Sequence, residues 1–195
     1  MPPWIKSEQV SDIDRRASKI FYKTLDTENS LQRLRELATH RNIENRALAI
    51  RCLAHLGEFE DLVSSLRDED QKPMWQIYFE AAQNAIARNA DVAAKLRLTL
   101  EKQRAEKSAD LYRLFWGYSK ADLEGGQAAQ LVEDLNSDDL DIRVLGFMNL
   151  KAITGMNLLY RPEATAALRR QPVQAWQQRL KDGVIVPKAP AKTPG

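Results

Sequence analysis

The sequence predicts an all-α protein, and three observations support this class. Glycine and proline are scarce, at eight each in 195 residues, whereas the strong helix formers Ala, Leu, Arg, Glu and Gln are abundant. Apolar residues recur along most of the chain with the period of an amphipathic helix. Two segments, 42–57 and 139–155, also share a pattern of apolar and small residues, which indicates an internal repeat.

The composition sets broad limits on function. The 29 basic and 27 acidic residues give a net charge of +2 and are mixed along the chain, so no strong field attracts nucleic acid or acidic lipid. The length fits one domain with a substantial core. The single cysteine, Cys52, can form neither an internal disulfide nor a zinc site, and we expect it to be a small core residue.

The sequence has no apolar run long enough to span a membrane, and the N-terminal MPPWIKSEQ lacks the basic start and apolar stretch of a signal peptide. The chain as written is therefore expected to be soluble, and cytoplasmic if it is complete. The start PPWIKSEQVSD is also typical of a longer chain that continues after a proline-containing linker. Membrane attachment is expected only through such a longer parent chain.

Capping residues mark the expected helices in order. Ser11 can cap a helix over 12–25 and Ser30 one over 31–38, because each offers a side-chain oxygen to the free amides of the first turn. Gly57 is a left-handed stop for the helix over 42–57. The remaining helices are expected over 58–68, 72–88, 89–107 with Asn89 as its cap, 108–119, 125–135, and 137–155 between Ser137 and Gly155. The short connections make successive helices antiparallel.

The internal repeat becomes explicit when Arg46 is set on Arg143, an offset of 97 residues. Apolar residues then coincide at three pairs, and small residues coincide where two helices must approach closely: Ile43 with Leu140, Leu48 with Leu145, Leu53 with Leu150, and Ala49 with Gly146. Two further apolar helices, near Ile77 and Leu111, imply a repeat of about 31 to 34 residues. The sequence thus predicts four helical hairpins, each with an amphipathic first helix and a second helix that is apolar over a wider arc.

An acid-rich turn followed by an arginine at the start of the second helix resembles the HEAT repeat, most clearly in the first and last hairpins. This resemblance implies a right-handed α-solenoid of about four HEAT-like hairpins. A tetratricopeptide array has a compatible period and remains an alternative, although its signature residues are missing. The predicted organisation is one domain over 1–183, with an N-terminal capping helix in 1–29, repeats over 30–156 and a C-terminal cap over 157–183.

The C-terminal segment departs from the repeat. A Tyr-Arg-Pro corner at 160–162 leads into a helix on which Val173, Trp176 and Leu180 share one face. This capping helix is expected to cover the last hairpin and to bury Trp176, and the arginine of the corner should bond to carbonyls or acids at the end of the last repeat. Residues 184–195 are rich in Pro, Lys and Ala and are expected to be a disordered tail.

The spacing of polar residues predicts no catalytic or metal-binding group. The aspartates within 138–141 lack the glycine turn and distal glutamate of a calcium loop, so they are expected to complement the start of a helix. His40 and His55 have neither zinc-protease spacing nor a neighbouring nucleophile, and they are expected at the surface. The glycine pair at 125–126 is expected to break a helix rather than to bind phosphate. The predicted protein is not an enzyme and holds no metal or cofactor.

Aromatic residues of the two middle hairpins are the candidate binding residues. The stretches PMWQIYF and LYRLFWGY place Trp75, Tyr78, Tyr112 and Trp116 on second helices, with Tyr78 and Tyr112 about one repeat apart. Tyr112 and Trp116 are four residues apart and share one helical flank. Second helices of such arrays often line the concave surface, where aromatic side chains can anchor a protein or peptide partner. The alternative is that these residues cement adjacent hairpins.

Several stretches together resemble a known family: PPWIKSEQVSDIDRRAS, LYRLFWGYS, DIRVLGFMNLKAITGMNLLYRPEA and PVQAWQQRLKDGVIV. They are similar to the helical C-terminal region of bacterial FecR-domain proteins, membrane-associated regulators related to anti-sigma signalling. The resemblance covers nearly the whole chain, while the FecR domain itself and a transmembrane helix are absent from these 195 residues. It implies a module on the extracytoplasmic, periplasmic side of an anchored parent chain that contacts another protein and carries no catalytic residues.

Two functions from different classes follow from these features. The first is a non-catalytic protein–protein interaction scaffold, the helical module of a FecR-type envelope signalling regulator. The second is a nucleic-acid-binding protein of HEAT-like repeats, which needs a basic stripe along its concave surface. Aromatic residues outnumber basic ones in the central second helices, so we expect a protein or peptide partner and no nucleic acid.

Overall fold

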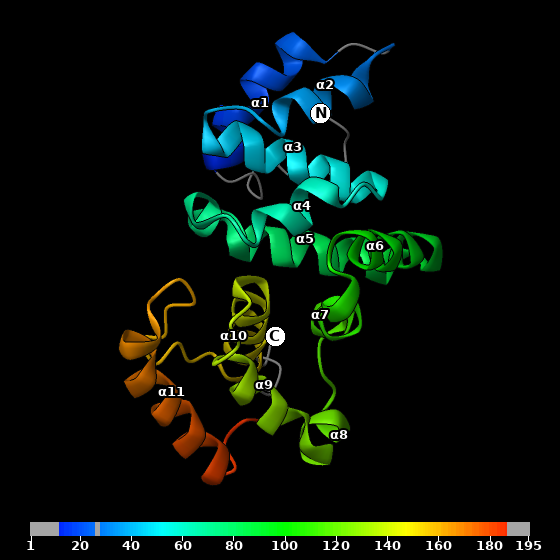
Figure 1. The fold of residues 1–195 in the computed structure, drawn as a ribbon. Coiled ribbons are helices and arrows are strands. Elements are labelled where there is room, and N and C mark those ends of the chain that lie inside the picture. The colour runs from blue at the N-terminus through cyan, green and yellow to red at the C-terminus, as the bar shows by residue number, and fades with distance from the viewer. Residues whose placement is uncertain (1–11, 26–27, 187–195) are drawn as a thin grey trace, which may run out of the picture. The chain divides into compact units, whose positions relative to one another are not determined.

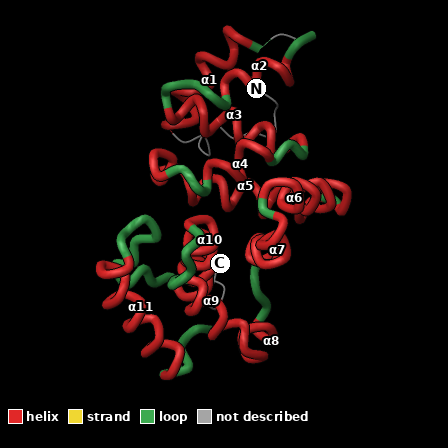
Figure 2. The backbone as a smooth tube through the Cα atoms, in the orientation of Figure 1, coloured by secondary structure: helices red, strands yellow, loops and turns green. Residues whose placement is uncertain are grey.

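The computed structural model describes residues 12–25 and 28–186, and within these ranges all regular structure is helical (Figure 1, Figure 2). This confirms the all-α class that the composition predicts. No described helix is both long enough and apolar enough to cross a lipid bilayer. The expected cap residue Ser11 and residues 187–195 of the expected tail lie outside the described ranges.

The chain divides into two compact units, Met1–Thr99 and Leu100–Gly195. The first unit contains α1 (Asp12–Thr24), α2 (Ser30–Leu37), α3 (Ile43–Leu56), α4 (Glu60–Ser65), the 3-10 helix η2 (Glu69–Met74), α5 (Trp75–Arg88) and most of α6 (Ala90–Gln103). The second contains the 3-10 turn η3 (Ala105–Lys107), α7 (Ser108–Trp116), α8 (Lys120–Asp122), the π-helical turn η4 (Leu123–Gln127), α9 (Ala128–Asp134), α10 (Leu140–Thr154) and α11 (Ala166–Lys181). The single domain over 1–183 stays a prediction.

Helix α3 is central to the first unit, where it packs against α1, α2 and α5 (Figure 1). Its N-cap is Asn42, whose side-chain oxygen accepts hydrogen bonds from the amides of residues 44 and 45 at 2.9 and 3.1 Å. It ends at Gly57, which has a left-handed φ of 85°. Asn89 caps α6 in the same way: its side-chain oxygen accepts a hydrogen bond from the backbone amide of Asp91 at 2.7 Å. The predicted Gly57 stop and Asn89 cap are thus confirmed.

Helix α10 is the corresponding element of the second unit and packs against α7 and α9. Residues 141–150 are all buried, as expected of a helix that is apolar over a wide arc. Gly146 lets α10 approach α9 closely, because a Cβ atom at this position would lie 3.0 Å from the Cβ of Asp134. The helix ends at Gly155, with a left-handed φ of 72°. The close approach and the Gly155 stop were both predicted and are confirmed.

The hairpins α2–α3 and α9–α10 share a detail at the two arginines that the sequence overlay aligns. Arg46 donates from Nε to the backbone oxygen six residues earlier, at 3.1 Å. Arg143 donates from Nη1 to the backbone oxygen six residues earlier, at 2.7 Å. The N-cap residues also match, with φ −79° and ψ 120° at Asn42 and φ −80° and ψ 121° at Asp139. The same arginine corner therefore fixes the loop that enters α3 and the loop that enters α10.

Other helix ends differ from the sequence prediction. Asn29, and not Ser30, occupies the N-cap position of α2. The N-cap of α10 is Asp139, and Ser137 lies two residues before it. The backbone amide of Asp139 donates a hydrogen bond to the hydroxyl of Ser137 at 3.1 Å, so Ser137 stabilises the N-cap residue but is not the N-cap itself. The predicted helix break at 125–126 is confirmed, because Gly126 has a φ of 106° at a kink before α9.

The C-terminal segment packs against the rest of the second unit. Helix α11 contacts α9, and Trp176 is 0% exposed, as predicted. Arg161 does not hold the end of the last hairpin: it is exposed and pairs with Glu163, two residues along the chain, at 3.0 Å. The corner is held instead by Arg143, which donates from Nε to the backbone oxygen of Pro162 at 2.8 Å. Ile185, at the start of the expected tail, is buried.

Candidate functional site

The first unit carries a groove between α3 and α5 with a volume of about 410 Å³. Both helices are second helices of the predicted hairpins. The groove is lined by Leu48, Arg51, Cys52, His55 and Leu56 of α3 and by Ala81, Asn84 and Ala85 of α5. Most of this lining is apolar, so the groove is a candidate site for the apolar side chains of another molecule.

The spacing of small and large residues explains why a groove forms here. Leu48, Cys52 and Leu56 are spaced by four residues and follow one flank of α3. Ala81 and Ala85 have the same spacing on α5, and their small side chains leave the space between the helices unfilled. Ala85 is buried, whereas Leu56 is 52% exposed. The groove thus has a closed floor of small residues beside an open apolar wall.

Basic side chains stand at the end of the groove where α3 terminates. Arg88 donates from Nη2 to the backbone oxygen of His55 at 2.5 Å, and its Nη1 lies 2.6 Å from Nε2 of the same histidine. A cation at this place offsets the negative end of the α3 dipole. The side chain of Lys95 also lies against Gly57, since a Cβ atom there would be 2.9 Å from the lysine Cδ. Among the described residues that line the groove, none is acidic.

Two of the four predicted binding residues lie in the core of the first unit. Trp75 is 1% exposed and donates from Nε1 to the backbone oxygen of Ser65 at 2.9 Å. Tyr78 is 0% exposed and donates its hydroxyl hydrogen to Oε1 of Gln71 at 2.8 Å. Burial raises the pKa of Tyr78, because its phenolate form would lose hydration. Both side chains join α5 to the segment before it within the same predicted hairpin, and the alternative interpretation, contact between adjacent hairpins, stays a prediction.

The other two predicted binding residues form an aromatic pair in the second unit. The rings of Tyr112 and Trp116 on α7 meet edge to face, with centroids 6.0 Å apart and planes inclined by 82°. This confirms that they share one helical flank. Trp116 is 49% exposed and Tyr112 is partly exposed, so the pair presents aromatic surface. Because Tyr78 and Tyr112 belong to different units, a continuous aromatic row stays a prediction.

The turn after α7 is fixed by Arg113. Its guanidinium carbon lies 4.2 Å from the centroid of the Tyr118 ring, and its Nη1 donates to the backbone oxygen of Gly117 at 2.5 Å. Its Nη2 also pairs with Asp122 at 3.2 Å. Burial raises the pKa of Tyr118 to about 12, although the charge of Arg113 opposes this shift. These contacts give Arg113 a structural role next to Trp116.

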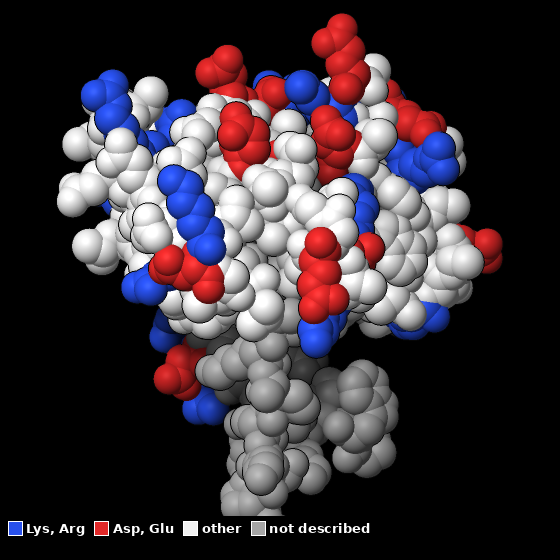
Figure 3. Space-filling model, turned by 90° about the horizontal axis from the view of Figure 1, so that it is seen from below, with Lys and Arg blue, Asp and Glu red and all other residues white. Residues whose placement is uncertain are grey.

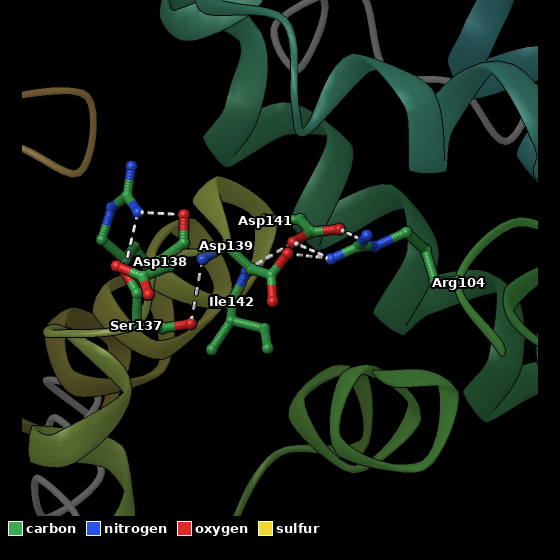
Figure 4. Close-up of polar contacts among 7 residues, drawn as sticks. Arg104, Ser137, Asp138, Asp139, Asp141 and Ile142 are labelled. Carbon is green, nitrogen blue, oxygen red and sulfur yellow. Dashed lines mark hydrogen bonds and ion pairs between the residues drawn. The ribbon is translucent and has the colours of Figure 1, made fainter. Parts of the chain in front are cut away.

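The acids at the start of α10 pair with an arginine. In Figure 4 the side chain of Arg104 points toward Asp139 and Asp141. Its Nε lies 2.8 Å from Oδ2 of Asp141, and its Nη2 bonds to Asp139. Asp141 is 1% exposed, and its Oδ1 also accepts the amide of Ile142 at 3.0 Å. Within residues 12–25 and 28–186 no group of three or more acidic, His or Cys side chains is placed to hold a metal ion. The acids thus tie residue 104 to the start of α10.

The corner before α11 is a further exposed apolar feature. Leu158 and Leu159 have left-handed φ values of 43° and 57°, a conformation that costs a non-glycine residue about 1 to 3 kcal/mol. The side-chain oxygen of Asn157 accepts the amide of Leu159 at 3.2 Å, and the hydroxyl of Tyr160 donates to the backbone oxygen of Leu135 at 2.6 Å. These bonds offset the strain and leave Leu159 83% exposed.

The groove was not predicted from the sequence. Cys52, expected in the core, is partly exposed and lines the groove, because the apolar arc of α3 extends beyond the surface that the core covers. His55 is exposed, as expected, but its place at the groove was missed. The four-residue spacing of Leu48, Cys52 and Leu56 was the available sequence feature.

Comparison of the chain with family models, with curated proteins and with solved structures finds no match.

Proposed function

We propose that the chain is a non-catalytic protein–protein interaction scaffold, built as a right-handed α-solenoid of about four HEAT-like hairpins with α11 as the C-terminal cap. The observation that carries this proposal is the arginine corner shared by α2–α3 and α9–α10. Two hairpins 97 residues apart that fix their loops in the same way support a common repeat. Stacked repeats offer an extended surface to a partner.

The packing within each unit supports the same arrangement. Helix α3 packs against α5 in the first unit, and α7 packs against α10 in the second. All four are second helices of the predicted hairpins, and contact between successive second helices is expected of a stacked array. The two middle hairpins lack the arginine, so their place in the array rests on the order and packing of their helices.

We also propose that this scaffold is the helical module of a FecR-type envelope signalling regulator. The support is the resemblance of the stretches 2–18, 111–119, 141–164 and 172–186 to that family. The middle stretch forms the end of α7, where Trp116 is exposed. A longer parent chain would supply the membrane anchor and hold the module on the periplasmic side. The scaffold role stands equally for a cytoplasmic chain.

The alternative function is nucleic-acid binding, which requires several Lys or Arg side chains gathered along one surface. On the face drawn in Figure 3, basic and acidic side chains are interspersed. The groove between α3 and α5 has a mainly apolar lining, and Arg51 is the one Lys or Arg among its described lining residues. Both observations favour a protein or peptide partner over a polyanion.

Site-specific photo-cross-linking in cells tests the scaffold function. A benzophenone amino acid replaces either Leu56, which is 52% exposed at the groove, or Leu98, a matched leucine that is 63% exposed on α6. We expect a discrete protein adduct from position 56 and none from position 98. Equal labelling at both positions, adducts to nucleic acid, or no adduct from position 56 would contradict the proposal.

A further inference from the structure

The α3–α5 groove is long enough to hold about two successive turns of a partner helix. Leu48 and Leu56 are eight residues apart on α3, which is about 12 Å along the helix at 1.5 Å per residue. An amphipathic helix that binds in a groove presents anchors at i, i+3 or i+4, and i+7, which span about 10.5 Å. The volume of about 410 Å³ also lies in the range of ~300–1,000 Å³ typical of binding pockets. The groove is therefore long enough and large enough for successive apolar anchors.

The floor of the groove determines the size of the anchor. Ala81 and Ala85 leave a hollow that opposes the Leu48–Cys52–Leu56 flank of α3. Ala85 is 2% exposed, so it is part of the packed floor, whereas Ala81 is partly open to solvent. A leucine-sized side chain inserted over Ala81 would replace solvent contact with apolar contact on both walls.

The charge around the groove determines the sign of the partner. None of the described lining residues is acidic, and Arg51 of α3 is one of them. Arg88 and Lys95 add positive charge near the end of the same helix. Complementary charge raises the association rate and excludes wrong partners. A partner with acidic residues beside its apolar anchors fits this surface.

From these observations we infer that the α3–α5 groove binds an acidic amphipathic helix of a partner protein, with a leucine-sized anchor over Ala81 and carboxylates facing Arg51 and Arg88. This inference rests on the proposed scaffold function and specifies the chemistry of its partner. Cys52 lies in the groove and is the single cysteine of the chain, so its thiol reports on occupancy.

Two synthetic peptides test the inference on the full chain. Both carry leucines at i, i+4 and i+7; one has glutamates on the flanking positions, and the other has lysines there. The acidic peptide should slow the reaction of Cys52 with an aromatic disulfide reagent and should bind at least about tenfold more tightly than the basic peptide. Equal affinities for the two peptides, or unchanged thiol reactivity, would overturn the inference.

Two pairs of matched substitutions, one at alanines of α5 and one at arginines, locate the binding site. Ala81→Leu fills the hollow and should weaken binding of the acidic peptide by about tenfold or more, whereas Ala87→Leu, on an exposed position of the same helix, should leave it unchanged. Arg51→Glu should reverse the preference toward the basic peptide, and Arg67→Glu should not. Should Ala81→Leu fail to fold, the Arg51 pair still decides the question, and equal effects within that pair would overturn the inference.

The proposed scaffold function and the inferred chemistry of the partner can fail separately. A protein adduct from position 56 together with no binding of the acidic peptide would overturn the inferred partner chemistry and leave the scaffold function standing. The absence of both an adduct and peptide binding would overturn both.

Discussion

Truncation of Trp176 is expected to destabilise the second unit by several kcal/mol. The indole is 0% exposed and lies with Val173 on the buried face of α11, which packs against α9. Removing a fully buried aromatic side chain costs about 3 to 5 kcal/mol, because its transfer free energy is lost and a cavity remains. Since a folded domain has about 5 to 15 kcal/mol in total, Trp176→Ala should remove at least about a fifth of the free energy of unfolding.

The buried indole nitrogen provides a more specific variant. In the described structure Nε1 of Trp176 has no hydrogen-bond partner, so its burial costs free energy that Trp176→Phe recovers while an aromatic ring is kept. We expect Trp176→Phe to lose less than half of what Trp176→Ala loses. The exposed neighbour Gln177 serves as the control, and Gln177→Ala should stay within about 0.5 kcal/mol of the unmodified chain.

Denaturant titration followed by circular dichroism measures these free energies, and hydrogen exchange locates them. Exchange in Trp176→Ala should accelerate in helices α7 to α11, while α2 to α5 should keep their protection because they belong to the other unit. A free energy of unfolding within about 0.5 kcal/mol of the unmodified chain would refute the assignment of α11 as a packed cap.

Two further predictions concern charged and titrating groups. Arg104→Ala leaves the carboxylate of Asp141, 1% exposed, without its ion-pair partner and should cost about 3 to 5 kcal/mol in chemical denaturation. The exposed control Arg179→Ala should cost below about 1 kcal/mol, and similar losses in the two variants would contradict the argument. Separately, burial raises the pKa of Tyr118 from 10.0 to about 12, so the folded chain binds more protons than the unfolded one between these values. Stability should be intact below pH 10 and should fall as the pH rises to about 12; denaturant midpoints that fall equally steeply in Tyr118→Phe would exclude this tyrosine as a cause.

The helix ends were predictable where a local rule decides them. Gly57 and Gly155 end α3 and α10 in the left-handed conformation that glycine adopts without strain, and Asn89 caps α6 through its own side chain. Each of these outcomes depends on a few neighbouring residues. The burial of Trp176 was predictable for a similar reason, because it lies with Val173 on the apolar face of one helix.

The fate of the aromatic residues was not predictable from helical period alone. Trp75 and Tyr78 have polar atoms that suit a binding surface, yet the fold supplies Ser65 and Gln71 as buried partners for those atoms. A tyrosine hydroxyl can be satisfied in a core as well as at a surface. Only the tertiary arrangement distinguishes these two residues from Trp116, which remains 49% exposed.

The groove was hidden from the sequence for a different reason. Ala81 and Ala85 are ordinary helix formers, and nothing in their neighbourhood along the chain indicates that they face a hollow. The hollow arises only when α3 and α5 pack side by side and the large side chains of one helix have small residues opposite them. Its existence depends on two segments about 30 residues apart, which no local rule connects.

The rate at which Cys52 is alkylated inside cells tests most directly whether a partner docks in the α3–α5 groove. Cys52 is the single cysteine and lines the groove, and a Cys52→Ser, Leu98→Cys variant reports how well the maleimide reaches the exposed surface of α6. Relative to this control, a groove that is about 90% occupied predicts alkylation about tenfold slower in cells than in the purified protein. The same relative rate in cells and in the purified protein would contradict a docked partner.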